Sequence, residues 1–311
     1  MTTIDVHHHL YPTGRDNEGR PWSVEATLEQ LHRNGIHAAV GNLPPTPDAG
    51  VDDGPARARR WNEWGAQLCR DHPGRLGLFA CLPLRDIDAA LAELAHAYDA
   101  LHVDGISLPT NDGDTWLSDD RFTPLLEEFD RRNAVLFVHP AATSRSDPDR
   151  RAYGGDLVSP PWLEFPTNTA RTILGLLIKG IPRRYPGIRF IFCHGGGTMP
   201  ALLGRIAGFD GWDTIGAETL ERTFPGGIHA GFAHFYYECA QAYAPEMFAL
   251  LRRVTPASHL LFGSDYSYFP VGHSVEQLRA LGLDGDTHSA VAGGNAASLF
   301  PRLEKCSGLS S

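Results

Sequence analysis

The sequence of 311 residues predicts a distorted (β/α)8 barrel, and three observations support this fold class. Short apolar runs alternate with amphipathic segments along almost the whole chain, which is typical of a parallel sheet wound by helices. Eight such repeats fit the usual length of a (β/α)8 barrel. Histidines and an aspartate stand at the ends of several predicted strands, where such a barrel places its active site. We therefore expect residues 1–311 to form one barrel domain, with an open doubly wound sheet as the alternative.

The predicted strands are apolar runs of the kind that is buried on both faces. They cover residues 4–10, 36–43, 76–82, 103–109, 134–139, 188–194, 234–240 and 259–265. The predicted helices cover residues 24–34, 55–72, 87–101, 122–132, 167–185, 198–208, 245–253 and 274–282. Ser23 and Asp86 stand where the first and third of these helices need N-caps.

Two predicted connections are longer than a compact barrel needs, at residues 141–166 and about 209–233. Loops of this length usually carry function, so we expect a lid or a binding wall there. Near the C-terminus, Gly293-Gly294-Asn295-Ala296 is expected to open a short closing helix.

Composition and charge exclude several classes of function. The 42% hydrophobic and 21% charged residues are typical of a soluble globular protein. A net charge of −10, with no run rich in Lys or Arg, argues against nucleic-acid binding. No apolar run is long enough to cross a membrane and no signal sequence precedes the first strand, so we expect a cytoplasmic protein. The cysteines are scattered without CxxC spacing, and several of them are expected to be buried thiols; they are Cys69, Cys81, Cys193, Cys239 and Cys306.

The strand nearest the N-terminus has the clearest chemical pattern, Ile4-Asp5-Val6-His7-His8-His9. Successive side chains of a strand point to opposite faces, so His7 and His9 would share a face and His8 would point away. Two imidazoles on one face indicate a metal site. By the same alternation Asp5 would lie on the His7 face, where it either orients an imidazole or only begins the strand.

Three other predicted strands end in residues of the same kind. His139 ends the fifth, His194 ends the sixth before Gly195-Gly196-Gly197, and Asp265 ends the eighth. Together with the His7 and His9 pair, they form a mixed nitrogen and oxygen set suited to a divalent transition metal. Asp265 could instead cap a turn, and His194 could pack beneath the glycines. We favour a functional role for His194, because three glycines let backbone and substrate approach closely.

The order of these motifs resembles the amidohydrolase superfamily, and within it the branch of aminocarboxymuconate-semialdehyde decarboxylase. The nearest likeness is to methylsalicylate-type decarboxylases, through residues 22–28 and 117–122. The wider resemblance covers essentially the whole chain, at residues 4–12, 136–140, 168–171, 184–186, 192–197 and 261–265.

The resemblance implies one divalent ion, usually zinc and in some members manganese. It also implies the ligand set His7, His9, His139 and Asp265, with His194 as an acid or base beside the metal. The metal would hold the substrate carboxylate and a neighbouring hydroxyl, while Asp265 or His194 would protonate the ring carbon that loses CO2.

The expected function is non-oxidative decarboxylation of a small aromatic or unsaturated acid, of the ortho-hydroxybenzoate type. A metal-dependent hydrolase of a lactone, an amide or a C–C bond is the first alternative, since the same site serves both. A barrel that has lost catalysis and only binds a partner is the second. The resemblance further implies a homodimer that acts on a small molecule, without nucleic acid or membrane.

Some residues around the expected site depart from the pattern of the family. Asn168 and Glu238 stand where aspartate is expected, which indicates an altered substrate wall. Arg145, Arg150 and Arg151 are candidates to pair with a substrate carboxylate, although most of them would be solvated loop charges. The candidate aromatic wall residues, which could equally be core, are Trp22, Trp162, Phe165 and Tyr268.

Overall fold

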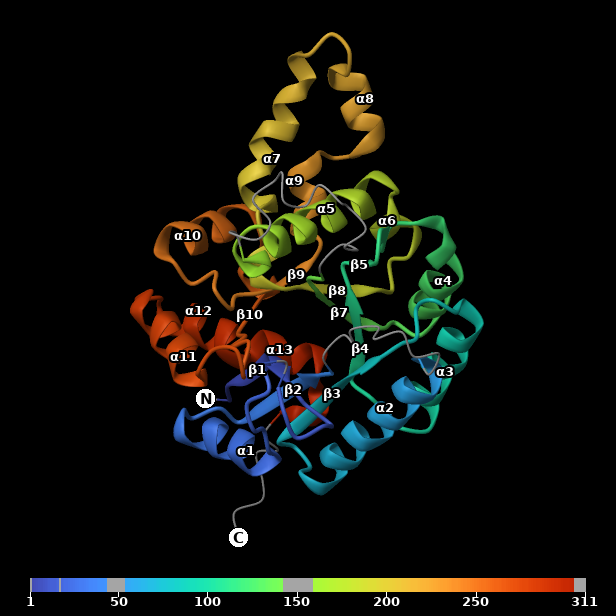
Figure 1. The fold of residues 1–311 in the computed structure, drawn as a ribbon. Coiled ribbons are helices and arrows are strands. Elements are labelled where there is room, and N and C mark those ends of the chain that lie inside the picture. Colours follow the sequence, from blue (N-terminus) through green and yellow to red (C-terminus); the bar gives the residue numbers. More distant parts are fainter. Residues whose placement is uncertain (1, 17, 44–53, 142–158, 305–311) are drawn as a thin grey trace.

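Eight parallel strands pair side by side in chain order in the computed structural model, which describes residues 2–16, 18–43, 54–141 and 159–304 (Figure 1). They are β1 (Ile4–His9), β2 (Ala38–Asn42), β3 (Leu76–Cys81), β4 (Gly105–Pro109), β7 (Val135–His139), β8 (Arg189–Phe192), β9 (Tyr236–Glu238) and β10 (Leu260–Leu261). The last strand meets the first, because Val6 N donates to Phe262 O at 3.0 Å and Asp265 N donates to His7 O at 2.9 Å. The predicted barrel is confirmed, and the open sheet is wrong.

Helices follow the strands and pack around the sheet (Figure 1). They are α1 (Val24–Arg33), α2 (Gly54–Asp71), α3 (Ile87–Asp99), α4 (Thr123–Arg131), α5 (Glu164–Ile178), α6 (Ile181–Arg184), α7 (Met199–Ala207), α10 (Pro245–Val254) and α11 (Val271–Ala280). Both predicted caps are confirmed, because Ser23 accepts from Ala26 N at 3.2 Å and Asp86 accepts from Ala89 N at 3.0 Å. The segment predicted as one helix at 167–185 is two, since Gly180 between them has φ 64° and ends the first in the left-handed region.

The connection predicted at 209–233 is not an irregular wall over the barrel. It contains α8 (Gly216–Thr223) and α9 (Ile228–Ala233), which form a projection with α7: α7 and α8 extend away from the barrel, and α9 packs against α5 at the base (Figure 1). Its glycines suggested a loop, but Gly216 and Gly227 lie at the starts of the two helices with φ of 70° and 90°. The projection exposes Trp212 and, in part, Leu202. Of the other long connection, residues 142–158 lie outside the described part of the chain.

Smaller elements complete the fold. A short hairpin that the sequence did not indicate follows β4, with strands β5 (Asn111–Asp112) and β6 (Thr115–Trp116). After α12 (Gly285–Ser289), a π-helical turn at Ala290–Gly294 leads into α13 (Asn295–Leu299), so the predicted closing helix is confirmed. None of the helices in the described residues is long and apolar enough to cross a membrane.

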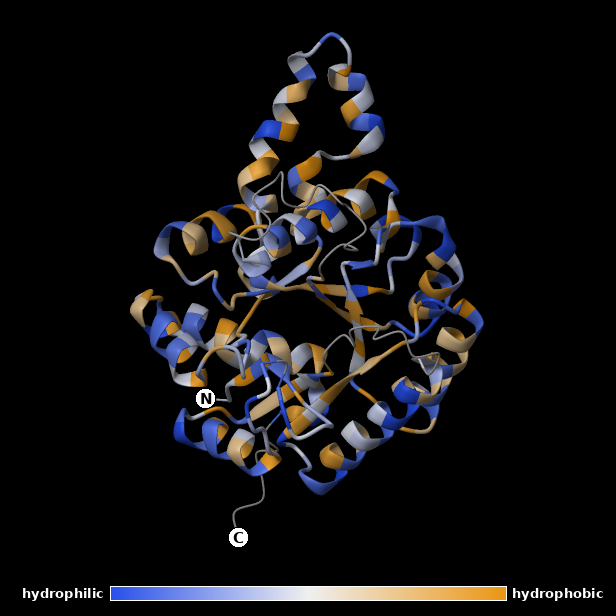
Figure 2. Cartoon of the chain, in the orientation of Figure 1, coloured by the Kyte–Doolittle hydropathy of each residue, from blue (hydrophilic) through white to orange (hydrophobic). Residues whose placement is uncertain are grey.

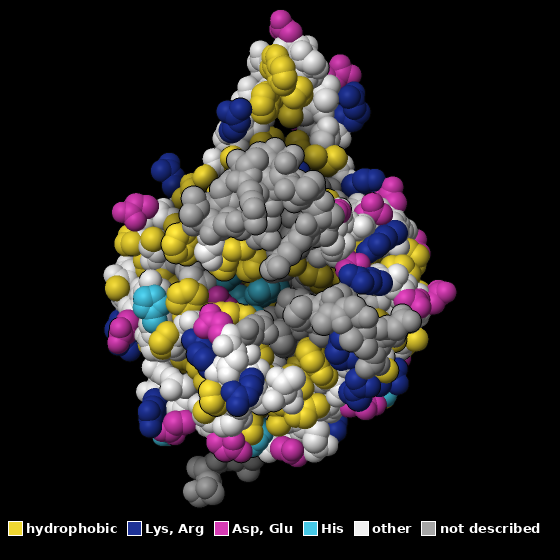
Figure 3. Space-filling model, viewed as in Figure 1, with side chains coloured by type: hydrophobic (Ala, Val, Ile, Leu, Met, Phe, Trp, Pro, Cys, Tyr) yellow, Lys and Arg dark blue, Asp and Glu magenta, His cyan; other side chains and the backbone are white. Residues whose placement is uncertain are grey.

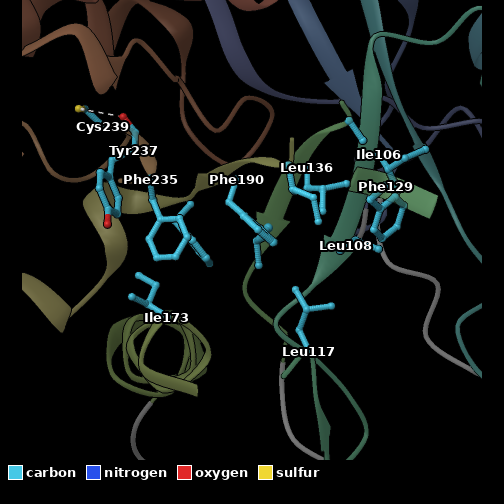
Figure 4. Close-up of a cluster of buried hydrophobic side chains, with 14 of the residues drawn as sticks. Ile106, Leu108, Leu117, Phe129, Leu136, Ile173, Phe190, Phe235, Tyr237 and Cys239 are labelled. Carbon is cyan, nitrogen blue, oxygen red and sulfur yellow. Dashed lines mark hydrogen bonds between the residues drawn. The ribbon is translucent and has the colours of Figure 1, made fainter. Parts of the chain in front are cut away.

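The core has two layers, which alternate along each strand. In β7, Val135 and Phe137 lie in the cluster inside the barrel, whereas Leu136 and Val138 pack outward toward the helices. The strands are accordingly largely apolar, whereas the helices carry both kinds of residue (Figure 2). Figure 4 shows part of the outer layer, where Leu136 and Phe190 lie between the sheet and Ile173 of α5. Cys69, Cys193 and Cys239 are buried free thiols as predicted, Cys81 is half-buried and Cys306 lies outside the described residues.

Candidate active site

A β-bulge in β1 determines where its three histidines point. Pairing with β2 runs from Ile4 opposite Ala38, slips after Asp5, resumes with His8 opposite Gly41 and continues with His9 opposite Asn42. The extra residue interrupts the alternation of side chains along β1. As a result two consecutive residues face the inside of the barrel: Val6 belongs to the inner cluster, and the ring of His7 packs on Phe137 of the same cluster.

The slip places Asp5 beside His8 and not beside the ring of His7. Asp5 Oδ2 lies 3.0 Å from His8 Nδ1 and accepts from Ser264 Oγ at 2.6 Å. The prediction that Asp5 shares a face with His7 is therefore wrong, whereas His8 is buried and points away from the other two histidines, as expected. Asp5 does orient an imidazole, but it is that of His8.

All four predicted ligands lie together at one end of the barrel. The ring centroids of His7, His9 and His139 are each 5.2 Å from the other two. Asp265 Oδ1 lies 3.2 Å from His7 Nε2 and 3.0 Å from His9 Nε2. Each of the four residues offers an atom within 4.8 Å of the others, a spacing that one metal ion could bridge.

Asp265 reaches the cluster from the loop that follows β10. Its φ is 58°, in the left-handed region that side chains other than glycine seldom occupy. Such backbone conformations persist where the surrounding structure holds them, often at functional sites. Here the hydrogen bond from Asp265 N to His7 O fixes the loop against β1.

The ring nitrogens of two histidines are oriented by hydrogen bonds on the side away from the cluster. His7 Nδ1 lies 2.8 Å from Glu238 Oε1, and His139 Nδ1 lies 2.8 Å from the carbonyl oxygen of Pro140. Each Nδ1 therefore donates its proton, which leaves Nε2 as the ring atom that faces the cluster.

The donor set fits a divalent metal ion. His7 Nε2 is buried and makes no well-aligned hydrogen bond, although Asp265 Oδ1 lies 3.2 Å away, which is costly for a polar atom unless something else satisfies it. Three imidazoles and one carboxylate are a donor set that zinc and related ions take in catalytic sites.

Glu238, at the end of β9, is a site residue that sequence reasoning misplaced. We expected it to alter the substrate wall, but it is fully buried beneath the histidines. Besides the bond to His7, its carboxylate accepts from His194 N at 2.6 Å and from Ala240 N at 2.7 Å. An acidic residue at the end of a predicted strand was the available signal.

His194 lies beside the four-residue cluster. Its ring centroid is 5.2 Å from that of His7 and 6.4 Å from that of His139. Its φ is also in the left-handed region, at 54°, and its Nδ1 lies 3.1 Å from the carbonyl oxygen of Ala240. Donation from Nδ1 leaves Nε2 available to a substrate or to a bound water.

The glycines after His194 are required by the packing of the chain itself. A Cβ at Gly197 would collide with the backbone of Pro166 at α5, and a Cβ at Gly196 would lie 2.8 Å from the Tyr237 ring. Both glycines also have positive φ. Close packing of helix and strand therefore accounts for them without the substrate contact that we expected.

Burial and charge shift the pKa values of the cluster in opposite directions. Burial lowers the pKa of His9, and burial with the neighbouring histidines holds that of His139 well below its usual range. Burial also disfavours a charged His7, but the carboxylates of Asp265 and Glu238 outweigh it and raise the pKa of His7 to about 10. Burial would raise the pKa of Asp265, but His7 and His9 hold it well below its usual range.

Metal loading is expected to release about one proton per ion near neutral pH, because an ion that takes the Nε2 lone pair of His7 displaces its proton. Because the pKa of His7 is raised to about 10, a proton competes with the ion for His7 Nε2 at neutral pH, and this competition weakens as the pH rises toward about 10. Zinc affinity should therefore increase with pH by about tenfold per unit between about pH 6 and 8. Calorimetric titration in buffers of different ionisation enthalpy measures the released protons. Zinc affinity that does not change with pH would show that His7 is already neutral.

The predicted wall residues lie at different distances from the cluster. The Tyr268 ring is 5.2 Å from that of His9, so Tyr268 borders the site. Trp22 packs on Tyr11, whose ring is in turn 6.2 Å from that of His9. Trp162 is 77% exposed at the surface.

Two of the remaining candidates, Asn168 and Phe165, lie on α5. Asn168 is buried and donates to Ala141 O at 2.8 Å, and Phe165 is half-buried in α5. Arg145, Arg150 and Arg151 lie outside the described residues. Figure 3 shows histidine side chains in a hollow at the centre of this face, beside hydrophobic ones.

Comparison with known proteins identifies the family. The family model described as Amidohydrolase matches residues 4–302. The decarboxylase yanB of Aspergillus niger is 31% identical over 98% of this chain and 89% of its own length. The 6-methylsalicylic acid decarboxylase of Penicillium expansum is 30% identical over 98% of both chains.

A solved structure shows the same fold. It is a dihydroxybenzoic acid decarboxylase from Polaromonas, solved with bound manganese and the inhibitor 2-nitroresorcinol. Its TM-score is 0.83 at 20% identity, with 96% of this chain and 97% of that chain covered. The resemblance drawn from the motifs is confirmed, and the chain belongs to the amidohydrolase family, among relatives that are named decarboxylases.

Proposed function

We propose that this protein is a metal-dependent, non-oxidative decarboxylase of a small aromatic acid with a hydroxyl group beside the carboxylate. The observation that carries the proposal is the convergence of His7, His9, His139 and Asp265 on one point, with His194 next to them. Relatives that align over almost the whole chain and are named decarboxylases support the same chemistry.

In this proposal His7, His9, His139 and Asp265 hold one divalent ion. We propose zinc, because an imidazole-rich set with one carboxylate suits it, and manganese is the alternative. When bound, the ion supplies a positive centre that orients the carboxylate and hydroxyl oxygens of the substrate and offsets their charge. Glu238 and the Pro140 carbonyl keep the rings of His7 and His139 turned toward that point.

The chain itself supplies the proton. As the bond between the ring carbon and the carboxylate breaks, CO2 leaves and the ring carbon takes a proton from His194, or from Asp265 once that carboxylate has itself taken up a proton. His194 supplies the proton from Nε2 when its ring carries both protons, because the Ala240 carbonyl holds Nδ1–H and Nε2 lies on the open side, where the side chain is 18% exposed. The neutral ring that remains is protonated again by water. Tyr268, against His9, would form one wall for the aromatic ring.

Incubation of zinc-loaded and manganese-loaded protein with salicylate and 6-methylsalicylate tests the proposal. We expect CO2 and the corresponding phenol in equal amounts, and one deuterium at the former carboxyl carbon when the reaction is run in D2O. Gas analysis and mass spectrometry measure both. Hydrolysis of lactones or amides without CO2 release would favour the hydrolase, and protein that binds no stoichiometric metal would favour a barrel without catalysis.

The proposal also covers the organisation of the protein. We place residues 1–311 in one domain and expect a cytoplasmic homodimer. Trp212 is 51% exposed on the projection formed by α7, α8 and α9, and pairing of two projections would bury it. Light scattering would then give twice the chain mass of 34.0 kDa.

A further inference from the structure

One histidine of the cluster lacks the hydrogen bond that the others have. The Nδ1 atoms of His7, His139 and His194 each have an oxygen acceptor, from Glu238 or from a backbone carbonyl. His9 Nδ1 is buried and has no hydrogen-bond partner. Metal-binding histidines almost always donate their second ring N–H, because this bond fixes the tautomer and the ring orientation. An acceptor for His9 is therefore required if its Nε2 binds metal.

Asn42 is placed to be that acceptor. It is the last residue of β2 and pairs in register with His9 of β1. Side chains in register on neighbouring parallel strands point to the same side, and the alternation from Ala38 and Val40 directs Asn42 into the barrel. Its side chain therefore emerges from the sheet next to that of His9.

The amide of Asn42 is also unsatisfied. The residue is 0% exposed, and both Oδ1 and Nδ2 are buried without a hydrogen-bond partner. Burying a polar amide without partners is costly, so such groups are rare unless they have a function. Two residues in register thus hold a buried ring nitrogen and a buried amide that both lack partners.

We propose that Asn42 is the positioning residue of His9: its Oδ1 accepts the Nδ1–H of His9 and turns His9 Nε2 toward the metal. This inference rests on the metal centre of the proposed function. Glu238 does the same for His7, but with a charged acceptor. Asn42 offers a neutral acceptor, which orients His9 without adding a third carboxylate to a cluster that already holds Asp265 and Glu238.

Asn42→Leu tests the inference, because leucine has a similar volume and no acceptor, and Asn42→Asp restores an acceptor. We expect Asn42→Leu to lower zinc affinity about 10-fold to 100-fold, and Asn42→Asp to retain affinity close to that of the wild type. Competition with a chromophoric chelator measures the affinities without reference to activity. In zinc-loaded protein with 15N-labelled histidine, one slowly exchanging Nδ1–H signal should disappear in Asn42→Leu.

Thermal unfolding separates this role from a structural one. Because the Asn42 amide makes no hydrogen bond to another described residue, Asn42→Leu should leave the Tm of chelator-treated protein unchanged or raise it. Only the increase in Tm on adding zinc should shrink. Equal zinc affinity in wild type and Asn42→Leu, with a raised KM alone, would assign Asn42 to substrate contact and overturn the inference. A wild type that binds no zinc would instead overturn the metal centre of the proposed function.

Discussion

Asp265→Asn is expected to abolish metal binding and decarboxylation together. Asp265 Oδ1 lies within 3.2 Å of His7 Nε2 and His9 Nε2, so the carboxylate is the negative member of the donor set. A neutral amide removes that charge and presents a weaker ligand. Asparagine tolerates the left-handed backbone at φ 58° nearly as well as aspartate, so the loop should keep its conformation.

Elemental analysis and product formation measure the two effects of Asp265→Asn. We expect metal content to fall from one ion per chain to a small fraction, and kcat/KM to fall by at least about 10³-fold. Asp284→Asn is a matched control, because Asp284 caps α12 far along the chain from the cluster and asparagine also caps helices well. Full metal content in Asp265→Asn, with unchanged turnover, would remove Asp265 from the site.

The strand ends could be predicted from sequence because of the geometry of a strand. In β7 the alternation that buries Val135 and Phe137 inside the barrel carries His139 to the same side. Parallel strands in a barrel all end at one rim, so residues at equivalent ends meet even when they are far apart in sequence. Position at this rim, more than alternation, predicts that His7, His9, His194 and Asp265 lie near His139.

The remaining features depend on tertiary contacts that no local pattern reveals. The bulge in β1 depends on pairing with β2, so alternation alone put Asp5 on the wrong side. The sequence predicts that Glu238 lies in a strand, but its bond to His7 depends on β9 and β1 meeting across the barrel. The helices α8 and α9 were missed because glycine marks both loops and helix ends.

His194→Asn is expected to separate metal binding from catalysis. The described residues contain a second possible ligand group, His7, His194 and Glu238, so position alone does not assign His194. Three contacts decide between the groups. Glu238 Oε1 already accepts from His194 N and His7 Nδ1, and His194 Nδ1 faces the Ala240 carbonyl. Because these bonds occupy the atoms that would face an ion there, the first group should hold the metal and His194 should act on the substrate.

The variant should therefore keep one ion per chain while kcat falls by about 10²–10⁴-fold, the usual contribution of a positioned acid or base. Asparagine is preferred to alanine here, because it tolerates the φ of 54° at this position. His229→Asn, on the exposed surface of α9, is the matched control and should retain full activity. The rate at which deuterium from D2O appears at the ring carbon is a second measurement, because slow protonation of that carbon should limit turnover in His194→Asn. If His194→Asn loses its metal, His194 is a ligand and Asp265 becomes the proton donor.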